Sequence, residues 1–324
     1  MMEVGYHASH EQFAPKQLKR LTSLAEGAGF AHAMCSDHFH PWGHQQGNSA
    51  FTWAWLGAVL EATTLSLGTV TPPMGFRYHP ALIAQAAGTL SQMYPERFAW
   101  LAIGTGEALN EHIVGRSWPS KSGRDTMLQA AAEIIRALWA GKTVSRIGPI
   151  AVDRARLYCR PPVAPDLFCA ALTPATAREH ASWSDGLLTV NQPPDRLEEI
   201  VQAYREGGGE GKLYLQVHLS WAETDAQASE QALDCWRYNL VSPALASQLP
   251  MPEDFEAATR TVGVADLDGR VFCSADLNRH VEWLSQFAAL GFSRLYLHFV
   301  GPNQQACIEA FARNVLPPLR RKIE

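Results

Sequence analysis

The chain alternates between two kinds of hydrophobic pattern. Short apolar runs rich in β-branched and aromatic residues are separated by longer segments whose apolar residues recur at helical spacing. This alternation is typical of repeated strand–helix units, in which helices join parallel strands. It predicts eight strands, at residues 3–7, 31–36, 65–71, 98–104, 167–172, 186–190, 213–220 and 294–300.

Helices are predicted between these strands, several of them with a proline or a capping residue at the start. Gly29 and Gly291 directly follow two of these helices. Eight strands interleaved with helices predict an α/β fold, a (β/α)8 TIM barrel. A doubly wound open sheet is the rival, but the first strand–helix turns lack the GxGxxG fingerprint of a dinucleotide fold. The predicted helices span residues 15–28, 49–63, 80–93, 125–140, 173–182, 194–205 and 277–290, with a closing helix at 303–313.

Two segments depart from the simple repeat. Residues 141–165, with the sequence "GPIAVDRARLYCRPP", read as a hairpin inserted between the fourth helix and the fifth strand. Residues 222–275 form a longer insertion after the seventh strand, and such excursions in barrels are usually lids or interfaces. Neither segment has the composition of an interdomain linker, so we expect residues 1–324 to form a single domain.

Composition narrows the class of protein. The net charge of -5 and the pI near 6.2 give no electrostatic footprint for nucleic acid or an anionic membrane. The first residues show no signal-peptide pattern and no apolar run is long enough to span a bilayer, so we expect a cytoplasmic protein. The six cysteines are scattered without a CxxC pair, which predicts reduced thiols and no zinc site.

Candidate chemistry lies where the predicted strands end, because the loops after the strands form the active site of a TIM barrel. The second strand runs into "SDHFHPW", which holds Asp37, His38, His40 and Trp42. An acid and an imidazole beside a tryptophan combine charge, a group that titrates near neutrality and an aromatic wall. Other predicted strands also end in or near candidate residues. These are Val70, Thr71 and Pro72 at the third, Thr105, Gly106, Glu107, Asn110 and Glu111 in "GTGEALNE" after the fourth, and His7, His218 and His298 on three more.

These candidates differ in weight. A lone histidine late in a strand, such as His218 or His298, is more often a structural residue than a catalytic one. "GTGE" alone is weak evidence of a functional site, since glycines permit any tight turn. Its position directly after a predicted strand strengthens that interpretation. A metal site built from His38, His40 and His44 lacks carboxylates at supporting spacing, so we expect no metal.

The motifs together resemble a known family. "GYHASHEQFAP", "SDHFHPW", "FRYHPALIAQ", "YPERF" and "GTGEALNE" are similar to the bacterial luciferase-like superfamily, and within it to the branch of the F420-dependent glucose-6-phosphate dehydrogenases. The resemblance implies a TIM barrel with a flavin-like ring in its mouth. It assigns His38 to take a proton from a substrate hydroxyl, Trp42 to stabilise the reacting centre and Glu107 to protonate the reduced ring.

The same resemblance implies the cofactor contacts and the assembly. Asp37 is expected to contact the cofactor, with Thr105 and Gly106 beside it, and Val70 and Thr71 match a strand bulge in which a non-prolyl cis peptide supports the ring. A homodimer is also implied. The substrate is expected to be a small alcohol, aldehyde or related carbonyl compound, bound beneath residues 222–275.

Two departures from the family pattern leave the cofactor open between F420 and FMN. The turn after the fifth strand has Leu172, Thr173 and Pro174 where relatives have two glycines, although Thr173 and Thr176 can still hold a phosphate at the helix start. The loop "TVNQPPDRL" lacks the lysine of sugar-phosphate dehydrogenases, which argues against glucose 6-phosphate as substrate. FMN would also permit monooxygenase chemistry with O₂, and a non-catalytic flavin-binding protein is a further alternative.

Overall fold

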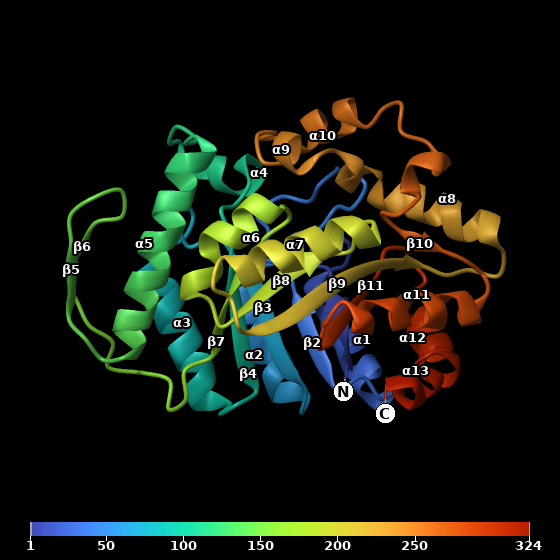
Figure 1. The fold of residues 1–324 in the computed structure, drawn as a ribbon, viewed down its shortest axis with the longest axis horizontal. Coiled ribbons are helices and arrows are strands. Elements are labelled where there is room, and N and C mark those ends of the chain that lie inside the picture. The colour runs from blue at the N-terminus through green and yellow to red at the C-terminus, as the bar shows by residue number, and fades with distance from the viewer. Residues whose placement is uncertain (1, 324) are drawn as a thin grey trace.

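Eight parallel strands close into a barrel in the computed structural model, which describes residues 2–323 (Figure 1). Each strand pairs with the next along the chain, and the last pairs with the first, which confirms the predicted TIM barrel. Every predicted strand is present, with ends shifted by at most two residues. The barrel strands are β1 (Glu3–Ala8), β2 (His32–Cys35), β3 (Ser66–Thr71), β4 (Phe98–Ile103), β7 (Asp166–Ala170), β8 (Gly186–Val190), β9 (Lys212–Ser220) and β11 (Arg294–Phe299).

Helices surround this barrel largely where the sequence predicts them. The fourth predicted helix begins at Lys121 rather than Asp125, because the side chain of Ser120 caps it by accepting the N–H of Gly123. The helix predicted to end at residue 182 ends at His180 and continues as a short 3₁₀ turn. The outer helices are α1 (Pro15–Gly27), α2 (Thr52–Ala62), α3 (Pro80–Met93), α5 (Lys121–Trp139), α6 (Pro174–His180), α7 (Pro194–Glu206), α11 (Leu277–Ala289) and α12 (Gln304–Asn314), followed by α13 (Leu316–Ile323), which was not predicted.

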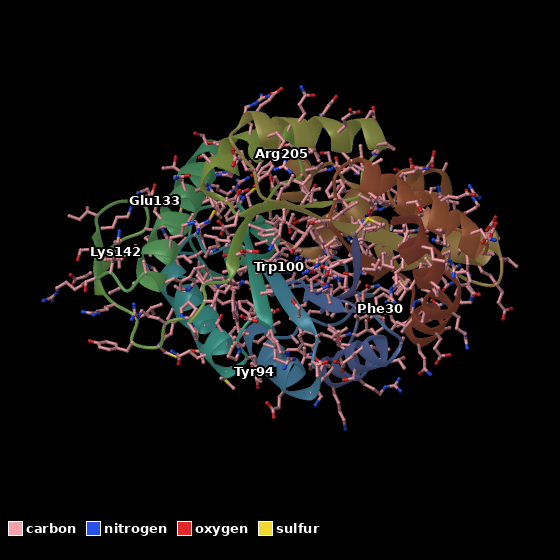
Figure 2. All side chains as sticks on the ribbon, turned by 60° about the horizontal axis from the view of Figure 1, so that its bottom comes forward. Phe30, Tyr94, Trp100, Glu133, Lys142 and Arg205 are labelled. Carbon is pink, nitrogen blue, oxygen red and sulfur yellow. The ribbon has the colours of Figure 1, made fainter. Side chains whose placement is uncertain are left out.

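The lower barrel is filled by aromatic side chains. Trp100 is fully buried at its centre (Figure 2), and its indole Nε1 donates a hydrogen bond to the hydroxyl of Tyr296 at 2.8 Å. Gly68 makes room for this ring, since a Cβ there would lie 2.1 Å from Trp100 Cε2. Phe168 and Tyr214 pack against the same indole. The lower barrel is therefore a packed core rather than a pore.

The two predicted insertions are confirmed. The first contains the antiparallel hairpin of β5 (Val144–Arg146) and β6 (Val152–Ala155), which projects beside α5 (Figure 1). The second contains α8 (Asp225–Trp236), α9 (Pro243–Ala246), α10 (Pro252–Ala258) and β10 (Phe272–Cys273), which adds a parallel strand to β9. The short helix α4 (Ala108–Glu111) follows β4. Within residues 2–323, no helix is both long and apolar enough to cross a bilayer.

Candidate active site

A cavity of about 900 Å³ opens at the carboxyl ends of the barrel strands. Residues of the second insertion, including Trp236, Leu240 and Pro243, cover it. The structure brings every predicted catalytic and cofactor-binding residue to its wall, as the loops of a TIM barrel dictate. These residues are Asp37, His38, Trp42, Val70, Thr71, Thr105, Gly106, Glu107, Thr173 and Thr176.

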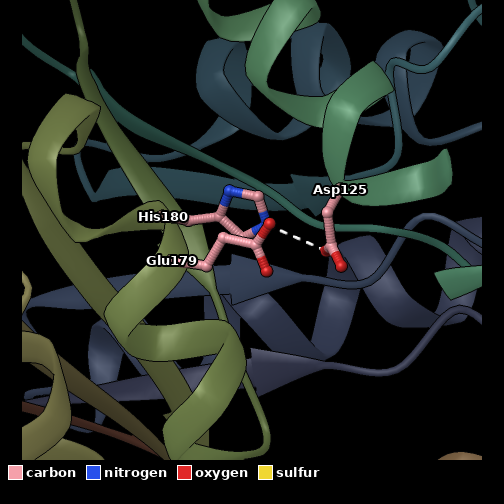
Figure 3. A group of neighbouring side chains, drawn as sticks. All are labelled: Asp125, Glu179 and His180. Atoms are coloured by element: carbon pink, nitrogen blue, oxygen red, sulfur yellow. Dashed lines mark hydrogen bonds and ion pairs between the residues drawn. The ribbon is translucent and has the colours of Figure 1, made fainter. Parts of the chain in front are cut away.

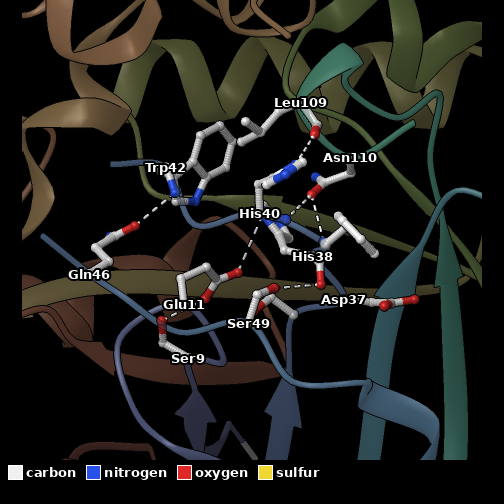
Figure 4. A network of polar contacts seen from close by, with 12 residues as sticks. Ser9, Glu11, Asp37, His38, His40, Trp42, Gln46, Ser49, Leu109 and Asn110 are labelled. Atoms are coloured by element: carbon white, nitrogen blue, oxygen red, sulfur yellow. Dashed lines mark hydrogen bonds and ion pairs between the residues drawn. The ribbon is translucent and has the colours of Figure 1, made fainter. Parts of the chain in front are cut away.

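His38 is held firmly by the loop that follows β2. Ser49 donates its hydroxyl to the His38 carbonyl at 2.6 Å, and Asn110 Oδ1 accepts the next backbone N–H at 2.8 Å (Figure 4). The imidazole ring lies 5.0 Å from the ring of Trp42, centroid to centroid. Its Nδ1 lies 3.5 Å from Oε1 of Glu11. The ring is thus fixed between an aromatic wall and a carboxylate.

Glu11 was not among the predicted site residues. It is buried three residues after β1, and Ser9 donates a hydrogen bond to its Oε2 at 2.7 Å. Burial raises the pKa of Glu11, but the positive form of His38 and the neighbouring hydroxyls outweigh it and lower the pKa to about 2. The acid in "HASHEQF", just beyond a predicted strand, was the signal available in the sequence.

The charge of Glu11 determines which nitrogen of His38 is free. Burial is the largest influence and lowers the pKa of His38 below its ordinary value, although the Glu11 carboxylate opposes this. The imidazole is therefore neutral at pH 7. A carboxylate beside Nδ1 favours the tautomer with the proton on that nitrogen, which leaves Nε2 as a base.

Glu107 has the opposite protonation preference. It follows β4 and lines the same cavity. Burial, with smaller contributions from the carboxylates of Glu11 and Glu111, raises its pKa to about 8. Glu107 is therefore mostly protonated at pH 7, so that the cavity combines a neutral base with a neutral acid. Groups whose environments push their pKa values apart are the mark of an acid–base site.

Asp37 is bonded within the protein. Its carboxylate accepts hydrogen bonds from Thr71 Oγ1 at 2.7 Å, Tyr78 at 3.2 Å and Arg77 Nη1 at 3.1 Å. Arg77, which the sequence reasoning did not select, also pairs with Glu111 through its Nε at 3.3 Å. This network ties together the loops after β2, β3 and β4.

The prediction of a cis peptide bond at Val70 and Thr71 is wrong, because residues 2–323 contain only trans peptide bonds. A trans bond is favoured by about 3–4 kcal/mol outside proline. The irregular pairing of β3 lies earlier, between Leu67 and Gly68, where the strand accommodates the ring of Trp100. Val70 and Thr71 still line the cavity from regular strand positions.

The far end of the cavity lies between α5 and α6. Thr173 caps α6, accepting the N–H of Thr176 at 3.3 Å and donating to its hydroxyl at 3.0 Å. Lys121 and Arg124 of α5 line the same end, together with the acids Asp125 and Glu179, and Lys121 pairs with Asp125. In contrast, Arg196 pairs with Glu199 on the surface of α7 and is not part of the cavity wall.

The histidines considered as metal ligands are engaged elsewhere. His40 Nδ1 lies 2.9 Å from the carbonyl of Leu109, and His44 pairs with Glu253 and Glu256.

One group of potential metal ligands was found among the described residues, namely Asp125, Glu179 and His180, with ligand atoms within 4.8 Å of one another (Figure 3). His180 Nε2 already bonds Asp125 at 3.0 Å, its Nδ1 accepts from Trp183 at 3.3 Å, and Lys121 pairs with Asp125. We assign this group to the packing of α5 against α6.

Comparison with known proteins agrees with this geometry. Residues 2–299 match the family described as luciferase-like monooxygenase. The chain is 32% identical to an F420-dependent glucose-6-phosphate dehydrogenase of Mycolicibacterium smegmatis, over 99% of this chain and 98% of the relative. The solved structure of an F420-dependent secondary alcohol dehydrogenase with an F420-acetone adduct superposes with a TM-score of 0.91, at 30% identity, covering 100% of this chain and 99% of the other.

A more distant structure shares the fold. It is a Baeyer-Villiger monooxygenase from Pseudomonas putida in complex with FMN, at a TM-score of 0.67 and 15% identity, with 98% of each chain covered. The family match over most of the chain and the full-length relatives confirm the resemblance read from the motifs. This chain belongs to the luciferase-like monooxygenase family.

Proposed function

We propose that this protein is an oxidoreductase that transfers a hydride between a small alcohol or ketone and F420. The observation that carries the proposal is the pairing of neutral His38, backed by Glu11, with protonated Glu107 across one cavity. Alcohol oxidation needs a base near the hydroxyl proton, and imidazole meets that need. Two relatives at 30% and 32% identity carry names of F420-dependent dehydrogenases, which supports the choice of cofactor.

The residues present fit such a cofactor. Small and apolar residues at the carboxyl ends of β3, β4, β7 and β8, or directly after them, line the cavity, which suits the face of a flat ring. They are Val70, Pro72, Gly104, Ala170 and Leu188. Lys121 and Arg124 lie at the end where a phosphate would be held. A bound F420 supplies the acceptor for the hydride.

The chain's own groups manage the protons. His38 Nε2 takes the hydroxyl proton as the carbinol carbon loses its hydride, so that the substrate leaves as a ketone or aldehyde. The resulting imidazolium is stabilised by the Glu11 carboxylate, 3.5 Å from Nδ1. Trp42 packs against His38 and closes one wall of the cavity. Glu107 holds a proton that it would donate to neutralise the negative charge on a reduced cofactor bound in the cavity.

A second candidate function is an FMN-dependent monooxygenase. The turn after β7 favours it, because Leu172 and Thr173 stand at the cavity wall where F420-dependent relatives are expected to have glycines. Reduced FMN reacts with O₂, whereas a reduced deazaflavin does so poorly. Redox turnover with either cofactor would exclude the remaining alternative, a non-catalytic flavin-binding protein.

Separate titrations of the apoprotein with F420 and with FMN test the proposal. Quenching of cofactor fluorescence and of tryptophan emission reports binding, since Trp42 and Trp236 line the cavity. Tight binding of F420 alone is expected. Tight binding of FMN alone would overturn the choice of cofactor and direct attention to O₂ chemistry. Binding of neither would overturn the assignment of the cavity.

The raised pKa of Glu107 predicts an upper limit to the pH range of activity. Because the carboxyl group is protonated below a pKa of about 8, kcat/KM should fall as the pH rises through that value. The side chain in Glu107→Gln stays neutral at every pH, so kcat/KM of this variant should no longer fall above pH 8. Its kcat at pH 7 should drop about 100-fold, because glutamine has no carboxyl proton to donate. The exposed Glu210→Gln is the control. If kcat/KM of Glu107→Gln still falls at high pH, a group other than Glu107 causes that fall.

We also propose a homodimer of one-domain subunits in the cytoplasm, acting on a small molecule rather than on nucleic acid or membranes. The net charge of -5 and the six free cysteines agree with this assignment. Ile147 in the hairpin insertion is 99% exposed and Tyr158 beyond it is 92% exposed, which offers apolar surface to a second copy. Light scattering after size exclusion is expected to give twice the chain mass.

A further inference from the structure

A cluster of polar side chains lies on the neighbouring strands β1, β11 and β9, and its members His7, Gln216 and His218 line the cavity. His7 stacks on His298 with ring centroids 4.4 Å apart. The amide nitrogen of Gln216 lies 3.1 Å from His218 Nε2 and 3.3 Å from His298 Nδ1. His298 Nε2 in turn lies 2.8 Å from Gln12 Oε1. The rings are therefore held in fixed positions.

His7 stands out within this cluster because it lacks partners. It is 2% exposed, lines the cavity, and neither ring nitrogen has a hydrogen-bond partner among the described residues. Buried polar atoms are almost always paired in folded proteins. Unpaired ones that face a binding cavity mark a place where a ligand completes the hydrogen bonds.

The chemistry of the cluster defines what it can bind. Burial lowers the pKa of His7 to about 4 and that of His218 to about 3, so both rings are neutral at pH 7. A neutral imidazole offers one N–H donor and one bare nitrogen, and an alcohol hydroxyl offers one donor and an acceptor oxygen. The nearest carboxylate in the cavity, Glu11, is already engaged by His38 and Ser9.

The cluster lies apart from the surface assigned to the cofactor. The apolar wall belongs to β3, β4, β7 and β8, whereas His7 and His218 come from β1 and β9. A substrate that presents its reacting carbinol to His38 therefore has room to extend over these histidines.

We propose that His7, Gln216 and His218 form a hydroxyl-binding subsite for a second polar group of the substrate. The preferred substrates are then diols or hydroxyketones rather than simple alcohols. The identity of the reacting group rests on the proposed function, but the subsite itself rests on the two unpaired ring nitrogens of His7 and on the place of all three residues in the cavity wall.

Matched pairs of alcohols test this subsite. Linear diols with 1,2-, 1,3- and 1,4-spacing are compared with the mono-alcohols of the same carbon number, using the F420-loaded enzyme. The best diol is expected to exceed its mono-alcohol by about 10-fold in kcat/KM, the effect of one well-made hydrogen bond to a buried group. His7→Phe keeps the stacked ring but removes both nitrogens, and should abolish that preference while leaving the mono-alcohol within about threefold.

His218→Phe is the second variant, and His32→Phe is the control. His32 is likewise buried inside the barrel but pairs with Glu3 at the opposite end and does not line the cavity. Thermal unfolding in equal concentrations of each alcohol gives a readout independent of turnover, because a ligand that binds the folded state raises Tm. The diol should raise Tm of the wild-type protein more than the mono-alcohol does, and the difference should vanish in His7→Phe.

The outcomes separate the two proposals. If no alcohol is turned over but the diol still stabilises the wild-type protein through His7, the proposed reaction fails and the subsite stands. If wild-type enzyme treats diols and mono-alcohols alike in both readouts, or if His7→Phe and His218→Phe impair both alcohols equally, the cluster is structural and the subsite is rejected.

Discussion

Replacing His38 with alanine is expected to lower kcat for alcohol oxidation by about 10³-fold. The variant loses the only base that the proposal places beside the reacting hydroxyl, and it leaves the Glu11 carboxylate without a cation to stabilise. Affinity for the cofactor should stay within about threefold, since the apolar wall and the α5–α6 end of the cavity are untouched. Stopped-flow reduction of F420 measures the hydride step directly, and fluorescence titration measures the affinity.

His44→Ala provides the comparison for this variant. His44 belongs to the same loop, but its side chain is 60% exposed and pairs only with surface glutamates, so kcat should be unchanged. Added imidazole should restore part of the activity of His38→Ala by supplying the missing base. Wild-type turnover in His38→Ala would remove the catalytic assignment.

Arg77→Ala is expected to lower the free energy of unfolding by about 3–5 kcal/mol, the usual cost of breaking a buried ion pair. Arg77 is 8% exposed at its side chain and bonds Asp37 and Glu111, which are almost fully buried. Burial already raises the pKa of Glu111 and the guanidinium of Arg77 opposes this rise. Without the guanidinium the pKa of Glu111 rises further, so the variant regains stability relative to wild type as the pH falls. Urea unfolding at pH 7 and pH 5 measures both effects.

Arg196→Ala is the matched control for this prediction. Its ion pair with Glu199 lies on the exposed surface of α7, and its loss should change stability by less than about 0.5 kcal/mol. Equal losses in Arg77→Ala and Arg196→Ala, or a loss in Arg77→Ala that does not depend on pH, would show that the network around Asp37 contributes little.

The barrel could be predicted because its signals are local. Strands that are buried on both faces appear in the sequence as apolar runs. Helices are recognised by apolar residues at helical spacing and by the glycines that follow them, such as Gly29 and Gly291, both of which have positive φ. The cavity residues could be predicted in turn because loops after parallel strands meet at one end of a barrel. His38 and Glu107 were among the candidates that this rule collected, whereas their proposed roles came from the likeness to the family.

The partners of these residues could not be predicted in the same way. The role of Glu11 depends on its contact with His38, and the role of Arg77 depends on its contacts with two carboxylates from other loops. The sequence alone does not give these contacts. The helix at Leu316–Ile323 was missed because its two prolines, Pro317 and Pro318, suit a first helical turn as well as a coil. The β3 irregularity was misplaced because it depends on the bulk of Trp100, which pairs with Gly68 from the adjacent strand β4.

The pairing of β1 with β11 has a consequence for how this chain is made. Glu3 bonds Arg294 across 291 positions, and the hydroxyl of Tyr6 donates to Gln304 across 298. Strand β1 therefore leaves the ribosome long before its partner exists, and its backbone edge stays open until residue 299 has been synthesised. Such distant contacts slow folding and leave an edge prone to association. Chaperone binding during synthesis should concentrate on this unclosed seam.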